Sequence, residues 1–184
     1  MSLPIWGLTR EYKCSASGMS LQFMKTIAKS QINEAWNIAL AATPDQARTW
    51  MEDLMRQEPF IDAYLFTADE HYAPSEKRGL IFLLGFLIWR ILSPQQPGPK
   101  RVSYHQLIAA QQENIRLMYE LAESLGADFL DAANKMIQSH NQGPLLETVR
   151  DTLASIRSAA TAPLDANLRL ALVHLKTVAD CLDR

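Results

Sequence analysis

The chain has little cysteine and little glycine for its 184 residues. Its two cysteines, Cys14 and Cys181, stand near opposite ends, which argues against a disulfide framework and against a zinc site of closely spaced thiols. The seven glycines form no glycine-rich fingerprint and no Gly-Lys-Ser or Gly-Lys-Thr loop. Common phosphate-binding motifs are therefore missing. Cysteines this few and this far apart favour a reducing compartment, so we expect the protein in the cytoplasm.

The chain also lacks an excess of charge and a long apolar run. Its 18 basic and 20 acidic residues give a formal net charge of −2, which supplies no general attraction for nucleic acid or for an anionic membrane. The longest apolar run begins at Leu80, and even when extended to Leu92 it would form a helix of roughly 20 Å, shorter than the hydrocarbon core of a bilayer at about 30 Å. We therefore expect neither a nucleic-acid partner nor a membrane span.

Motifs for metal binding and for catalysis are missing too. None of the four histidines follows a glutamate by three residues, and no two have the spacing of a metalloprotease helix, so we expect no metal and no cofactor. No serine lies in a Gly-X-Ser-X-Gly turn, which leaves no recognisable catalytic motif. The densest ionisable group, Asp62, Asp69, Glu70 and His71, fans out around a helix and predicts a solvated helix end.

Helical periodicity dominates the sequence, which predicts an all-α fold of about eight helices. They cover approximately residues 20–42, 44–58, 60–72, 75–92, 103–125, 128–140, 144–156 and 165–182. Thr43-Pro44-Asp45-Gln46 and Ser103 with Gln106 have the pattern of capping boxes, which fix two of the helix starts.

The apolar run from Leu80 predicts a central helix, at about residues 80–92, that the others surround. Gly85 within it suits a place where a neighbouring helix crosses closely. Three prolines and a glycine between residues 93 and 102 predict a surface crossover inside a single domain of residues 19–184. Residues 1–18 have no helical period and no basic region before their apolar residues, so we expect an extended or weakly ordered segment rather than a secretory signal.

The last predicted helix is apolar on two sides. One face carries the main stripe, and Leu170, Val173 and Cys181 recur on the opposite face at helical spacing. This second face is either sandwiched between layers of the same chain or forms an interface with another subunit, such as a second copy in a homodimer.

Gln111 projects from the apolar stripe of the helix predicted at 103–125. A buried amide needs a hydrogen-bond partner, so Gln111 either bonds within the core or serves as a polar group of a pocket. With no catalytic motif, these features favour a non-enzymatic interaction or scaffolding module that binds another protein. The alternative is a small-molecule-binding helical protein, or an enzyme, whose site lies between helices.

Overall fold

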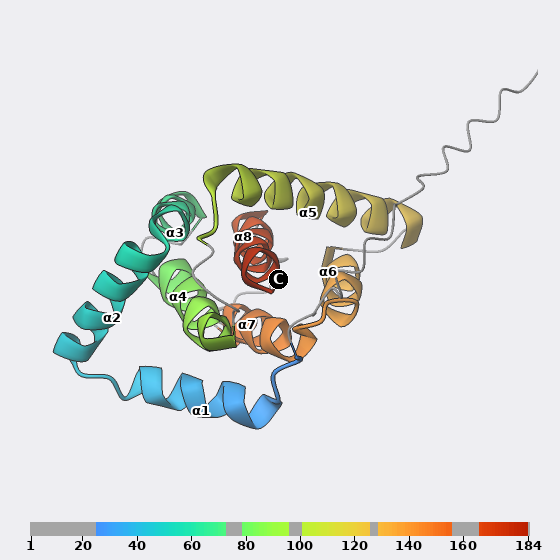
Figure 1. Ribbon diagram of the computed structural model, residues 1–184. Helices are drawn as coiled ribbons and strands as arrows, with labels where there is room; N and C mark the ends of the chain where they lie inside the picture. The colour runs from blue at the N-terminus through green and yellow to red at the C-terminus, as the bar shows by residue number, and fades with distance from the viewer. Residues whose placement is uncertain (1–24, 73–78, 96–100, 126–128, 156–165, 184) are drawn as a thin grey trace, which may run out of the picture.

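The computed structural model describes residues 25–72, 79–95, 101–125, 129–155 and 166–183. These residues form a single compact domain of eight α-helices without strands (Figure 1), which confirms the predicted fold class. The predicted segment 1–18 and part of the crossover, residues 96–100, lie outside the described residues. The helices are α1 (Lys29–Leu40), α2 (Pro44–Gln57), α3 (Pro59–Tyr72), α4 (Leu80–Leu92), α5 (Tyr104–Leu125), α6 (Phe129–Gln138), α7 (Gly143–Ser155) and α8 (Ala166–Leu182), with a 3-10 turn, η2 (Ser93–Gln95), after α4.

Both predicted capping boxes are present. The Thr43 hydroxyl accepts a hydrogen bond from the backbone N–H of Gln46, and the Gln46 side chain accepts one from the backbone N–H of Thr43 at 2.9 Å. Ser103 and Gln106 make the same reciprocal pair at the start of α5. These local signals fix the starts of α2 and α5 because they satisfy backbone donors that have no partner within the helix.

The first helix begins later than the sequence predicts. Residues 25–28 are not helical, and α1 starts at Lys29. The buried side chain of Gln142 accepts a hydrogen bond from the backbone N–H of Ile27 and donates one to the backbone carbonyl of Lys25. This contact, made more than 100 residues away in the sequence, holds the chain in a non-helical conformation there.

The helix at the centre of the bundle is α8, with α3, α4, α5, α6 and α7 around it (Figure 1). It packs most extensively against α5, α4 and α3. All residues from Ala171 to Ala179 are buried, which explains why the sequence of this helix is apolar on two sides. The apolar helix α4, which the sequence predicts as the central helix, is buried in the same core and lies beside α8. It packs against α8 and α3 and also contacts α1 and α2, and its Leu84 and Leu87 are each only 1% exposed.

Gly85 of α4 is the point where α3 crosses most closely. A Cβ atom at this position would lie within 3.0 Å of three carbon atoms of the Leu65 side chain. Leu65 is itself fully buried, so it has little room to move away. The glycine therefore allows α3 and α4 to pack in direct contact.

We expect Gly85→Ala to lower the free energy of unfolding by about 1–3 kcal/mol, the usual cost of overpacking a core. The sign is informative, because helix propensity alone would favour alanine by about 1 kcal/mol. Urea denaturation of the variant measures the change. Adding Leu65→Ala should make the double variant less costly than the sum of the two single changes; strict additivity would show that this contact is not the cause.

Candidate functional site

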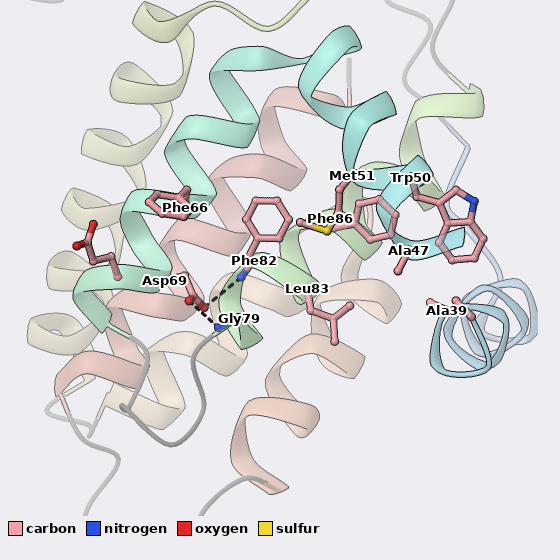
Figure 2. Close-up of a pocket in the computed structure, with 12 residues that line it drawn as sticks. Ala39, Ala47, Trp50, Met51, Phe66, Asp69, Gly79, Phe82, Leu83 and Phe86 are labelled. Carbon is pink, nitrogen blue, oxygen red and sulfur yellow. Dashed lines mark hydrogen bonds between the residues drawn. The ribbon is translucent and has the colours of Figure 1, made fainter. Parts of the chain in front are cut away.

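A pocket of about 620 Å³ opens where α2, α3 and α4 meet the end of α1 (Figure 2). We call it the apolar pocket. Figure 2 shows Trp50 at one end and Asp69 toward the other, with Phe82 and Phe86 between them. Its volume falls in the usual range for ligand sites, which is roughly 300–1,000 Å³. The side chains that define it are Trp50, Met51, Phe66, Phe82, Leu83 and Phe86.

Three helices each present one face to the apolar pocket. On α4 the lining residues Phe82, Leu83 and Phe86 follow helical spacing, so they lie on one side of the helix. The ring of Trp50 stacks on that of Phe86 with 6.2 Å between centroids. The guanidinium of Arg90 lies 4.0 Å from the centre of the Trp50 ring, an attractive cation–π geometry. These contacts fix the Trp50 end of the pocket.

Several large apolar side chains of the apolar pocket are exposed to solvent. Phe66 is 65% exposed and Met51 is 47% exposed. Met55, one turn further along α2, is exposed as well and lies on the same face as Met51. An apolar surface that continues beyond the pocket itself is typical of a binding site. Met51 is exposed because its side of α2 faces the pocket and not the core.

Asp69 is buried, contrary to the prediction of a solvated helix end. Its carboxylate accepts hydrogen bonds from the backbone N–H groups of Gly79 at 2.7 Å and Ile81 at 2.9 Å, with a longer one from Phe82. A carboxylate here satisfies donors at the start of α4 and interacts favourably with the helix dipole. Glu70, its exposed neighbour, also lines the apolar pocket, so this end of the pocket is acidic.

Gln111 lies in a second, smaller hollow of about 340 Å³ between α3 and α5, with His174 of α8 also in its lining. We call it the Gln111 cavity. The Tyr64 hydroxyl donates a hydrogen bond to Oε1 of Gln111 at 3.2 Å. Two histidines, His71 and His174, line the same cavity. The structure thus places Gln111 both in a side-chain hydrogen bond and at the wall of a pocket.

Burial lowers the pKa of His174 from 6.5 to about 4, and the nearby His71 contributes to the same shift. The His174 ring packs against Tyr64 with 5.0 Å between centroids. A histidine with this pKa is uncharged at neutral pH.

Leu170, Val173 and Cys181 do not form an exposed patch. Val173 is 3% and Cys181 2% exposed within a single chain, and Leu170 is half-buried. The chain itself covers this face of α8, as in the sandwiched alternative. The interface hypothesis therefore loses the exposed surface on which it depended.

A buried polar cluster joins α5, α8 and the turn after α6. The ammonium group of Lys176 donates to both carboxylate oxygens of Asp180 and to Oδ1 of Asn114, at 2.8–2.9 Å. Asp180 also accepts from Asn114 and bonds Nε2 of His140 at 2.7 Å. Burial alone would raise the pKa of Asp180, but the hydrogen bonds from His140, Lys176 and Asn114 and the charge of Lys176 hold it below 3.8.

The hydrogen bonds of His140 hold this cluster in one arrangement. The backbone N–H of Gln142 donates a hydrogen bond to Nδ1 of His140 at 2.8 Å. Because Nδ1 accepts this bond, the ring proton is on Nε2, which faces Asp180. None of Lys176, Asp180 or His140 lines either hollow described above. We assign the cluster to the stability of the fold.

Within the described residues, no three His, Cys, Asp or Glu side chains gather closely enough to hold a metal ion. No helix in that part of the chain is long and apolar enough to cross a membrane. Comparison of the chain with models of known families, with curated proteins and with solved structures finds no match. The apolar pocket and the Gln111 cavity are therefore the candidate sites.

Sequence reasoning identified Gln111 but missed the apolar pocket. Phe82 and Phe86 have the composition and spacing of core residues, and periodicity shows only that a helix has an apolar face. Whether that face meets another helix or solvent depends on the tertiary packing. The one available signal was the surplus of apolar residues on α3, where Phe66 falls outside the stripe of Ile61, Tyr64, Leu65 and Ala68.

Proposed function

We propose that the protein is a non-enzymatic, cytoplasmic interaction module that binds an amphipathic helix of a partner protein in the apolar pocket. The observation that carries this proposal is the exposure of Phe66, Met51 and Leu83 around an open apolar hollow. Such side chains remain in water only at a cost of about 25 cal/mol for each Å² of apolar surface. A partner that covers them recovers this free energy.

The length of the apolar pocket suits a helix. Its α4 wall runs from Gly79 to Phe86, which is two turns or about 10 Å. Apolar residues at positions i, i+4 and i+7 of a partner helix span the same length, as in other helix-in-groove complexes. Met51 and Met55 add flexible, polarizable side chains at the edge, which adapt to different partner residues.

The charge around the pocket favours a basic partner. Residues 44–72, which form two of its walls, include seven acidic residues and only two basic ones, Arg48 and Arg56. Glu70 lies at the pocket itself. Complementary charge raises the association rate and sets the orientation of the bound helix, so we expect lysine or arginine on the polar face of the partner.

The test uses a fluorescein-labelled synthetic peptide of leucine and lysine, with leucines on one helical face, and fluorescence anisotropy with the intact protein. We expect Phe66→Ser and Met51→Ser to weaken binding by about tenfold each, since each removes roughly 1.5 kcal/mol or more of apolar contact. Both residues are exposed, so folding should be preserved. Tyr119→Ser, an equally exposed aromatic position on α5, serves as the matched control and should bind as the unaltered protein does.

A second peptide with the same composition but no apolar face separates helix recognition from charge attraction. Equal affinity for the two peptides would overturn the proposal, as would an affinity that Phe66→Ser does not change. Light scattering provides a further check: a dimer that Phe66→Ser dissociates would assign the apolar pocket to a second copy of the chain instead.

A further inference from the structure

The Gln111 cavity forms where α3 and α5 separate above α8. Both helices pack against α8 but contact each other much less. On α3 the cavity residues Tyr64, Thr67 and His71 lie along one face, whereas the apolar pocket uses Phe66, Asp69 and Glu70 on the other side of the same helix. In the described part of the chain the two hollows share no lining residue, so we treat them as separate sites.

Among the residues that the structure describes, no Asp, Glu, Lys or Arg lines the Gln111 cavity. The ionisable groups that face His174 there are His71 and Tyr64 from α3 and Tyr104 from α5. A charged ligand would lose its hydration in this cavity without gaining an opposite charge, which is costly. The lining therefore favours an uncharged ligand at neutral pH.

The polar groups of the cavity both donate and accept hydrogen bonds. The amide of Gln111 carries two N–H donors, and its Oε1 has a second lone pair besides the one that Tyr64 uses. An amide group on the ligand matches this mixture of donors and acceptors.

Aromatic rings form much of the remaining wall. Phe60 and Tyr104, both exposed, come from the starts of α3 and α5, and Tyr64 with His174 forms a tilted pair of rings deeper in the fold. Flat aromatic surfaces favour a planar ligand that stacks or packs edge-on against them. We propose that the Gln111 cavity binds a small, uncharged aromatic amide whose carboxamide pairs with the amide of Gln111.

The probes are 2-naphthamide and its anionic isostere 2-naphthoate, each titrated into the intact protein at pH 7.5 by isothermal calorimetry. We expect 2-naphthamide to bind at least tenfold more tightly than 2-naphthoate. Gln111→Met, which removes the amide at similar volume, should weaken 2-naphthamide about tenfold, the usual effect of losing one well-formed hydrogen bond in a pocket. Tyr104→Ala, at an exposed position, should weaken it without affecting folding.

Two control variants locate the site. Tyr119→Ala removes an exposed tyrosine that lies on α5, as Gln111 does, but outside the cavity; this variant should bind 2-naphthamide as the unaltered protein does. Phe66→Ser, in the apolar pocket, should also leave the binding of 2-naphthamide unchanged. Three results would each overturn the proposal: no heat of binding with 2-naphthamide up to millimolar concentration, equal affinity for 2-naphthoate, or loss of 2-naphthamide binding in Phe66→Ser but not in Tyr104→Ala.

Discussion

Replacing Lys176 by methionine is expected to lower the free energy of unfolding by about 3 kcal/mol. The change removes the ammonium group that bonds Asp180 and Asn114 but keeps most of the apolar side chain, so the loss comes mainly from a carboxylate left in the fold with fewer partners. Breaking a buried pair in this way costs about 3–5 kcal/mol. We expect the lower end, because the Asp180 side chain is still 25% exposed. Chemical denaturation with urea measures the effect.

The matched control is Lys135→Met, which removes an exposed lysine of α6 and should change stability by less than about 0.5 kcal/mol. Adding Asp180→Asn to Lys176→Met should recover part of the loss, since no uncompensated charge is then left in the cluster. Equal stability of the Lys176→Met and Lys135→Met variants would show that this pair does not contribute to the fold.

The parts of the fold that the sequence predicts well are those set by nearby residues. The capping boxes at Thr43 and Ser103 depend only on contacts between residues three positions apart. The eight helices are predicted from apolar residues that recur with the repeat of a helix. The start of α1 was predicted too early because the residue at which this helix begins depends on Gln142, which only the tertiary fold brings close to it. A contact of this kind leaves no local pattern.

Tertiary packing also decides where most residues of the proposed sites lie. Asp69 belongs by sequence to a charged helix end, and its burial follows from the position of α4. The two apolar sides of α8 predict that both are covered, yet they do not say whether the cover is the same chain or another copy. Gln111 was identified because a polar residue within an apolar stripe is a local anomaly that periodicity can detect. In the apolar pocket the only comparable signal is Phe66, which lies outside the apolar stripe of α3.

The stability of the protein is expected to fall in mild acid through His174. In the folded state its pKa is about 4, against an ordinary value of 6.5, so below pH 6.5 the unfolded chain takes up a proton that the folded chain does not. The free energy of unfolding therefore decreases as the pH falls from 6.5 to 4, and this contribution levels off as the pH falls further and His174 is protonated in the folded chain as well. A shift of this size corresponds to a loss of about 3 kcal/mol.

Comparison with His174→Phe isolates this contribution from that of other titrating groups, because phenylalanine keeps a ring in the same place and takes up no proton. Urea denaturation at pH 7.5 and at pH 4 should show the unaltered protein losing about 3 kcal/mol more than the variant between these two conditions. His105→Phe, which changes an exposed histidine of α5, should leave the pH dependence as it is. The same pH dependence in the His174→Phe variant would mean that His174 takes up its proton in the folded chain as readily as in the unfolded one.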